Sequence, residues 1–179
     1  MYPVSEDSLF FSELLKKYFS RISMEKKEKI KYLDMGTGSQ ILAETAEKAG
    51  IRKENILCID IDKECVNLAK KKGFKAIKSN LFSNLKINKN KKEKFDVISF
   101  NAPYLPEDKY DKKPDTTGGK KGDEISLRFL KQAKKYLNKN GKIFLLISSL
   151  TPFNRIKKFN PEIIARKMLF FEELILVEI

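Results

Sequence analysis

Short apolar runs alternate with amphipathic segments along the chain, the order typical of a parallel sheet with helices between its strands. Strands are predicted over residues 30–33, 56–59, 74–77, 95–100 and 142–148, and then over 163–165 and 174–177. We expect the last two to pair with each other at a sheet edge, because they follow closely on one another. The pattern predicts an α/β fold.

The segments between these runs repeat apolar residues at helical spacing. Helices are predicted over residues 6–21, 41–49, 63–72 and 124–138, with room for a short helix within 151–159. At the start of the first helix, Glu6 and Asp7 are expected to complement the positive end of the helix dipole. Segment 84–94 is a lysine-rich connection, and segment 104–122 is long enough, and rich enough in proline and glycine, to be functional.

Polar side chains follow three of the predicted strands. Asp34 with Gly36 and Gly38 follows the first strand, Asp60 closes the second, and Asn80 follows the third. Glycines let the backbone approach a ligand, and a strand-end carboxylate suits ribose hydroxyls. A dinucleotide fingerprint would need another glycine where Ile41 stands, so a small adenosine cofactor fits better than NAD. Such turns also arise from structural need alone, and both interpretations stay open here.

The strand at 95–100 runs directly into Asn101, Ala102, Pro103 and Tyr104. Proline holds the residue before it in extended geometry and removes a donor, so the neighbouring carbonyl groups can point outward. The Asn101 oxygen and one such carbonyl can each accept a hydrogen bond from a substrate NH2 group, while Tyr104 packs on a planar group. The alternative is a proline turn with a capping asparagine.

The amino-acid composition excludes several kinds of catalytic and metal site. The chain has no histidine, which excludes Ser-His-acid triads and imidazole metal sites, and Cys58 and Cys65 are too few for a thiolate site. No metal is therefore expected. The net charge of +13 favours an anionic partner such as nucleic acid, although a Lys- and Glu-rich composition equally suits heat adaptation. With no membrane span or signal peptide in its 179 residues, we expect one cytoplasmic domain, residues 1–179.

Together these features resemble the class I S-adenosylmethionine-dependent methyltransferases of the HemK/PrmC group, in its archaeal and eukaryotic branch. The resemblance rests on YPVSEDS (2–8), LDMGTGS (33–39), IDID (59–62), SNLF (79–82), NAPY (101–104) and GGKKG (118–122). It implies a Rossmann-like fold with a mostly parallel seven-stranded sheet, helices on both faces and an antiparallel edge strand. We interpret the GGKKG run as a mobile loop on the substrate side.

The resemblance also implies the composition of the site. S-adenosyl-L-methionine would be bound by Ser8, Asp34, Gly36, Thr37, Gly38, Asp60, Ile61, Asn80, Leu81 and Asn101. The methyl acceptor would meet Asn101, Ala102, Pro103 and Tyr104, and of these Asn101, Pro103 and Tyr104 would be catalytic. Three positions depart from the family pattern: Gln40 replaces a third glycine, Asn80 an aspartate and Ala102 a proline.

The branch that the chain resembles methylates the glutamine of the Gly-Gly-Gln motif in class I peptide chain release factors. A release factor is therefore the expected substrate, and a small zinc-binding activator is an expected partner subunit. One alternative is methylation of adenine amino groups in DNA or RNA, and another is an adenosine-binding scaffold without catalysis. The large side chains of Phe82, Phe153, Phe159, Phe170 and Phe171 fall near irregular segments, where they belong either to a covered apolar face or to the core.

Overall fold

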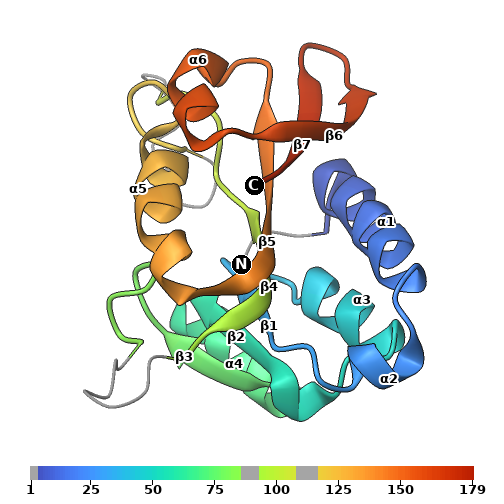
Figure 1. Cartoon of the computed structure of the whole chain (residues 1–179). Helices are drawn as coiled ribbons and strands as arrows, with labels where there is room; N and C mark the ends of the chain where they lie inside the picture. The colour runs from blue at the N-terminus through green and yellow to red at the C-terminus, as the bar shows by residue number, and fades with distance from the viewer. Residues whose placement is uncertain (1–3, 86–92, 108–116) are drawn as a thin grey trace.

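The computed structural model describes residues 4–85, 93–107 and 117–179, and within these ranges it forms a single seven-stranded sheet flanked by helices (Figure 1). The strand order is β3-β2-β1-β4-β5-β7-β6. The strands are β1 (Tyr32–Met35), β2 (Ile56–Asp60), β3 (Lys75–Lys78), β4 (Phe95–Asn101), β5 (Leu137–Ser148), β6 (Glu162–Met168) and β7 (Glu173–Glu178). Tyr2 and Pro3 of the first motif, most of the 84–94 connection and part of the 104–122 segment lie outside the described residues.

Strands β1 to β5 run parallel, whereas β7 runs antiparallel to both β5 and β6. The predicted fold class is therefore confirmed, including the pairing of the last two strands at the edge. The carboxyl ends of β1, β2, β3 and β4 meet at one edge of the sheet, which is where open α/β sheets bind ligands.

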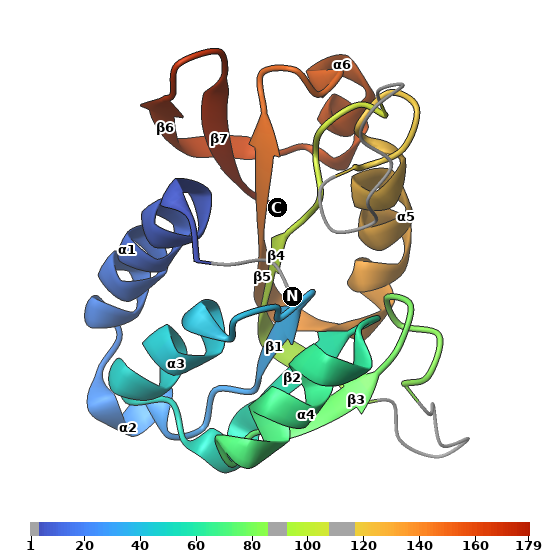
Figure 2. The same ribbon diagram turned by 180° about the vertical axis from the view of Figure 1, so that it is seen from behind.

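Helices cover both faces of the sheet because its strands alternate buried residues between the two faces. Tyr32, Val97 and Phe144 pack under the helices of one face, and their neighbours in sequence pack on the opposite side. The first face carries α1 (Glu6–Ser20), α3 (Ile41–Lys48) and α4 (Lys63–Lys71), and the second carries α5 (Glu124–Ala133) and α6 (Phe153–Ile156). Figure 2 shows α1 and α5 on opposite sides of the central strands.

The main error of the sequence prediction concerns the end of α5. The predicted helix 124–138 stops at Ala133, continues as a 3-10 turn over 134–136, and gives way to β5 at Leu137. Leu137 pairs with Phe95 on β4, and Asn138 Nδ2 donates to Asp96 Oδ1 at 2.6 Å. These long-range contacts override the helical periodicity of the segment.

Two smaller differences involve the region before β1. The structure contains a four-residue helix, α2 (Met24–Lys27), where no helix was predicted, and β1 begins two residues later than predicted. The short helix within 151–159 is confirmed as α6. No helix in the described ranges is both long and apolar enough to cross a membrane.

The large aromatic residues near irregular segments divide into two groups. Phe82 is buried and stacks on Phe129 and Tyr136, and Phe153 and Phe159 pack against the same core. Phe170 and Phe171, between β6 and β7, are 98% and 95% exposed. Of the two alternatives, the structure favours the core for Phe82, Phe153 and Phe159, and the activator subunit stays a prediction.

Candidate active site

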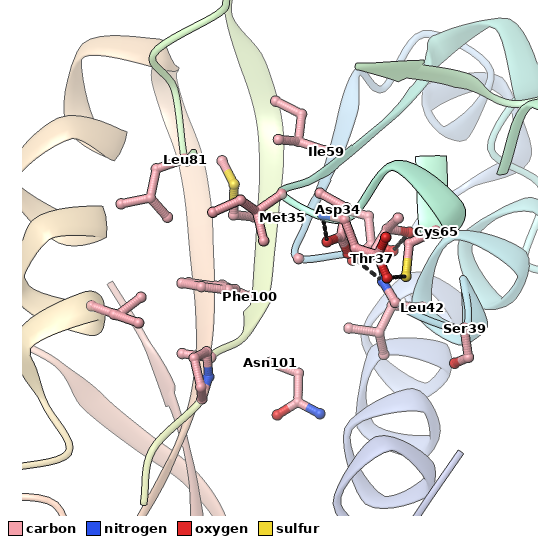
Figure 3. Close-up of a pocket in the computed structure, with 18 of the residues that line it drawn as sticks. Asp34, Met35, Thr37, Ser39, Leu42, Ile59, Cys65, Leu81, Phe100 and Asn101 are labelled. Carbon is pink, nitrogen blue, oxygen red and sulfur yellow. Dashed lines mark hydrogen bonds between the residues drawn. The ribbon is translucent and has the colours of Figure 1, made fainter. Parts of the chain in front are cut away.

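A cavity of about 750 Å³ opens at the carboxyl ends of β1 to β4, between the start of α1 and one side of α5 (Figure 3). A volume of this size suits a cofactor or substrate. The site residues predicted from the sequence all line this cavity: Ser8, Asp34, Gly36, Thr37, Gly38, Asp60, Ile61, Asn80, Leu81, Asn101, Ala102, Pro103 and Tyr104. Their separate roles remain predictions, but the structure brings them together.

The turn after β1 needs glycine for two different reasons. Gly36 and Gly38 have φ values of +62° and +46°, in the left-handed region that favours glycine. A Cβ atom on Gly36 would also lie 2.9 Å from the ring of Phe100, whereas one on Gly38 would have only a backbone oxygen at 3.8 Å. The first glycine therefore allows close packing of the turn on β4, and the second leaves open space beside the cavity.

Gln40 accounts for one departure from the family pattern. It also adopts a left-handed conformation, with φ +66°, immediately before α3. Its side chain is completely buried, and Nε2 donates to the carbonyl groups of Gly38 and Cys65. The Gln40 side chain thus links the turn to α4 by hydrogen bonds, and it does not occupy the cavity.

Asp60 is fixed at the end of β2 by two backbone donors. Its Oδ2 accepts from the N–H of Gly38 at 2.8 Å, and its Oδ1 accepts from the N–H of Asp62 at 2.8 Å. Burial raises the pKa of the carboxyl group, while the hydrogen bonds from Asp62 and Gly38 oppose that rise. Each oxygen keeps a second acceptor site, so the group can also receive hydrogen bonds from ligand hydroxyls.

Asp34 faces the interior from β1. Its Oδ2 accepts from Thr37 Oγ1 at 2.6 Å and its Oδ1 from Ser99 Oγ at 3.3 Å. The side chain is 1% exposed, and burial raises its pKa to about 7, against the lowering effect of these two hydrogen bonds. The geometry indicates that Asp34 holds the glycine turn in shape.

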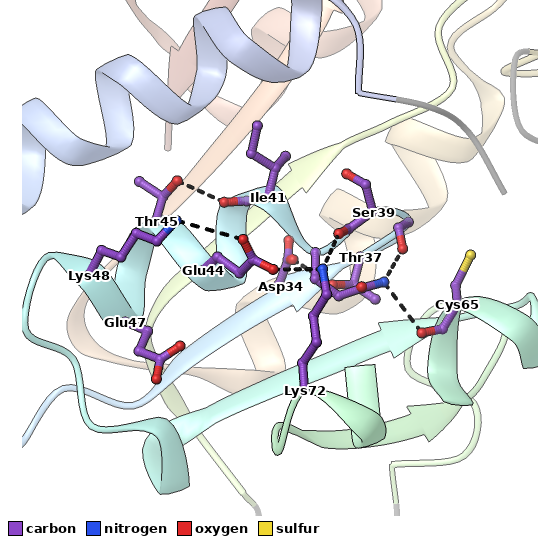
Figure 4. A network of polar contacts seen from close by, with 12 residues as sticks. Asp34, Thr37, Ser39, Ile41, Glu44, Thr45, Glu47, Lys48, Cys65 and Lys72 are labelled. Carbon is purple, nitrogen blue, oxygen red and sulfur yellow. Dashed lines mark hydrogen bonds and ion pairs between the residues drawn. The ribbon is translucent and has the colours of Figure 1, made fainter. Parts of the chain in front are cut away.

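An outer network supports the same turn (Figure 4). Lys72, just beyond α4, forms an ion pair with Glu44 of α3 at 2.6 Å and donates to the carbonyl of Ser39 at 3.2 Å. The lysine links the two helices that flank the turn. A partly exposed pair of this kind contributes only about 0.2–1 kcal/mol, so its effect is mainly geometric.

The far end of the cavity is formed by the residues after β3 and by α5. Leu81 is buried in a left-handed conformation, with φ +51°. Asn80 is exposed, and its Oδ1 accepts from Arg128 Nη2 at 3.1 Å. The side-chain oxygen of Asn80, which the sequence assigned to cofactor binding, therefore already accepts from an arginine, although it retains a second lone pair.

The NAPY run (residues 101–104), expected to meet the methyl acceptor, is called the acceptor motif below. It begins at Asn101, which projects into the cavity from the end of β4 (Figure 3). Its Nδ2 donates to Asp7 Oδ2 at 3.1 Å and lies 3.4 Å from Ser8 Oγ. Its Oδ1 is buried and has no hydrogen-bond partner among the described residues. A buried acceptor without a partner is costly, and at a cavity wall it is available to a ligand donor.

The glycine run predicted as a substrate-side loop packs against the backbone of the acceptor motif. A Cβ on Gly118 would lie 2.6 Å from the carbonyl oxygen of Pro103, and one on Gly122 would lie 2.4 Å from that of Tyr104. The N–H of Gly118 also donates to the carbonyl of Leu105 at 2.9 Å. Residues 118–122 are absent from the cavity lining and pack on the backbone of the motif, and their position beside the substrate stays a prediction.

Sequence reasoning missed several residues of the cavity wall. Asp7 was assigned to the helix terminus, Cys65 was considered only as a thiolate ligand, and Arg128 received no role. The cavity is also lined by Met35, Ser39, Ile41, Leu42, Ile59, Asp62, Phe100, Leu105 and Ile125. Only Asp7 carried a usable signal, because it stands directly before Ser8 in the first motif.

Comparison with known proteins gives matches over most of the chain. Residues 12–168 match the methyltransferase small domain family. A Methanocaldococcus jannaschii protein, provisionally named a protein N5-glutamine methyltransferase, is 36% identical over 163 residues, which cover 81% of this chain and 78% of that protein. A release factor glutamine methyltransferase of Rhodopirellula baltica is 28% identical, and the match covers 66% of this chain but 44% of the relative.

The fold also matches solved structures. The Thermus thermophilus 16S rRNA N2 G1207 methyltransferase, determined with S-adenosylmethionine and guanosine, superposes with a TM-score of 0.60 at 17% sequence identity. The superposition covers 98% of this chain and 43% of that enzyme. At this identity the likeness concerns the fold alone.

Proposed function

The chain belongs to the methyltransferase small domain family, as a HemK/PrmC-related class I methyltransferase dependent on S-adenosyl-L-methionine, and we propose that it methylates a glutamine side-chain amide. The proposed acceptor is the glutamine of the Gly-Gly-Gln motif in a class I peptide chain release factor. Two relatives named for glutamine methylation, one of them for release factors, support this choice of substrate.

The cavity fits the cofactor of this family. The open space beside Gly38 admits a ligand close to the backbone, and the fixed carboxylate of Asp60 offers acceptors for ribose hydroxyls. Leu81 and Asn80 would meet the adenine, and Ser8 would close the cavity from α1. When bound, the cofactor supplies an electrophilic methyl group on a sulfonium sulfur.

The observation that carries the proposal is Asn101 Oδ1, which is buried and has no hydrogen-bond partner in the part of the chain that the structure describes. An amide nitrogen is a poor nucleophile because its lone pair is delocalised, so catalysis depends on position and on support for developing positive charge. Asn101 Oδ1 can accept one N–H of the substrate amide, and the carbonyl of Ala102 can accept the other, since the Pro103 oxygen lies against Gly118. Such a pair of acceptors directs the lone pair of the substrate nitrogen at the methyl group of the cofactor. This arrangement requires no histidine, and the chain has none.

Adenine amines present the same NH2 chemistry and are the alternative acceptor. From the sequence, Tyr104 alone was expected to pack on a planar group, but the aromatic ring of Phe100 belongs to a residue that lines the cavity as well. Its ring lies against Gly36, where an added Cβ would clash with it at 2.9 Å, so one edge is already covered by the protein. The names of the relatives therefore favour glutamine more strongly than the count of aromatic side chains does.

Transfer of a labelled methyl group tests the proposal. We expect label from S-adenosylmethionine to enter a recombinant class I release factor and to be lost when its motif glutamine is changed to alanine. Asn101→Ala is the matched enzyme control, expected to bind S-adenosylhomocysteine but to transfer nothing. Labelling of adenine in DNA or RNA, with none in the release factor, would replace glutamine as the acceptor and leave the cofactor assignment standing.

A further inference from the structure

Asp7 lies in the first turn of α1, 5% exposed, at the wall of the cavity. One of its oxygens, Oδ1, accepts from the hydroxyl of Ser5 and from the backbone N–H of Ser8 at 2.6 Å. Its other oxygen, Oδ2, accepts from Asn101 Nδ2 at 3.1 Å. Only the first set of contacts satisfies a helix terminus, because Asn101 lies 94 positions along the chain on β4.

An asparagine amide can adopt two orientations related by a half-turn, which exchange its oxygen and its nitrogen. The proposed reaction requires one of them, with the oxygen toward the substrate NH2. A carboxylate only accepts hydrogen bonds, so Asp7 favours the orientation that turns Nδ2 toward α1. The reversed orientation would place two oxygens opposite each other and would offer two donors, in place of an acceptor, to the substrate.

We infer that Asp7 is a positioning residue for methyl transfer, which orients the Asn101 carboxamide so that Oδ1 faces the methyl acceptor. The inference rests on the proposed function in requiring an NH2 acceptor, but it holds for a glutamine amide and an adenine amine alike. The carboxylate also lies behind the amide, where it stabilises positive charge that develops on the acceptor nitrogen. Asp7 thus acts through Asn101, without touching the reacting atoms.

Asp7→Asn separates this role from helix capping. The introduced asparagine can still accept from the Ser8 N–H with its oxygen, which leaves its NH2 group facing Asn101 and favours the reversed amide. Because a hydrogen bond to a charged group is worth about 1.5–3 kcal/mol, we expect kcat to fall by about 10-fold or more. The midpoint of thermal unfolding and the affinity for S-adenosylhomocysteine should stay near those of the wild type.

Glu6→Gln is the matched control. Glu6 lies in the same helical turn, and its Oε2 is 3.5 Å from Lys167 Nζ, but its side chain is 67% exposed. It contributes to the helix terminus without reaching Asn101, so its loss should leave kcat within about two-fold, since exposed pairs are weak. A fall in kcat as large as that of Asp7→Asn would overturn the inference in favour of a helix-terminus effect.

A reciprocal exchange provides a rescue. Asn101→Asp alone opposes two carboxyl groups and should be nearly inactive. Combined with Asp7→Asn, it restores a donor facing an acceptor, with a carboxylate oxygen still turned to the substrate. We expect the double variant to be more active than either single variant. Activity of the double variant at the product of the two single losses would show that the sites are not coupled, and would overturn the inference.

Nuclear magnetic resonance tests the contact without any substrate, which keeps this inference separate from the choice of methyl acceptor. The Asn101 side-chain NH2 signals are identified by their absence in Asn101→Ala. In the wild type they should exchange slowly with solvent, and in Asp7→Asn they should shift and exchange faster, with Glu6→Gln unchanged. Unaltered signals in Asp7→Asn would overturn the inference, whereas a failure of release factor methylation alone would count only against the proposed substrate.

Discussion

The backbone N–H of Gly38 donates to Asp60 Oδ2 across 2.8 Å, so the turn after β1 is fastened to the end of β2. This contact joins two parts of the chain that both line the cavity and were both predicted to bind the cofactor. The same carboxylate both shapes the turn and faces the cavity, where its remaining lone pairs can accept hydrogen bonds from ligand hydroxyls.

Asp60→Ala should therefore weaken binding of S-adenosylhomocysteine by about 10-fold or more, because it removes the hydrogen bonds to a charged acceptor as well as the support of the turn. Calorimetric titration measures the effect. Asp96→Asn is the control, since Asp96 is a half-buried carboxyl group near the opposite end of β4, where it accepts from Asn138. Equal losses in both variants would indicate general destabilisation.

The two glycines of the turn should differ in their response to alanine. Gly38→Ala introduces only left-handed strain, which costs about 1–2 kcal/mol of unfolding free energy. Gly36→Ala adds a clash with the buried ring of Phe100, and overpacking of this kind costs about a further 1–3 kcal/mol. Urea unfolding should rank the wild type above Gly38→Ala, and Gly38→Ala above Gly36→Ala.

Phe100→Leu provides the test of that cause. The smaller side chain relieves the clash, so Gly36→Ala should cost less in the Phe100→Leu background than in the wild type. An unchanged cost would assign the whole effect to backbone strain and contradict the packing argument.

Most of this architecture follows from the sequence, because apolar runs and glycine turns are local signals. The strand ends of Asp60 and Asn101 were placed correctly on that basis, whereas Asp34, expected after the first strand, lies within β1. The end of α5 was not, since Leu137 fits a helical period and only its pairing with Phe95 shows it to be a strand. Contacts distant in sequence carry no local signal.

The same limit explains which site residues were missed. In the sequence, Asp7 has the position of an ordinary acidic residue at a helix N-terminus. Its hydrogen bond with Asn101 forms only because the fold packs α1 beside the end of β4. Arg128 stands on the α5 surface, and its link to Asn80 spans 48 positions. Both side chains act through partners that the tertiary fold brings near, whereas Gly36 and Pro103 act through their own backbones.

Stability should depend on pH through Asp34. Burial raises the pKa of this carboxyl group from an ordinary value of 3.8 to about 7 in the folded chain. Between these values the folded state binds more protons than the unfolded state, so the contribution of Asp34 to stability is fully present below about pH 3.8 and is lost as the pH rises through about 7.

Asp34→Asn removes this titration. Whatever the cost of the substitution at low pH, the variant should gain unfolding free energy relative to the wild type between pH 5 and pH 8. Urea unfolding of both proteins at each pH measures the difference, in which the titration of all other groups cancels. A constant difference would mean that Asp34 keeps its ordinary pKa in the folded state.

Asn80→Asp should strengthen cofactor binding, because it restores the carboxylate found at this position in the family that the chain resembles. Asn80 Oδ1 already accepts from Arg128 Nη2 at 3.1 Å, and a carboxylate can accept from Arg128 and from an adenine amine together. Charge-assisted hydrogen bonds are stronger than neutral ones, so we expect an affinity gain for S-adenosylhomocysteine of about 3- to 10-fold. The gain should shrink when Arg128→Ala is added, since the introduced carboxylate then loses its fixed partner.

Asn84→Asp is the control, because it places the same charge nearby on a side chain that donates to the Lys78 carbonyl outside the cavity lining. An equal gain in that variant would trace the effect to the reduced net charge of the chain, and no gain in Asn80→Asp would remove position 80 from the adenine end of the site.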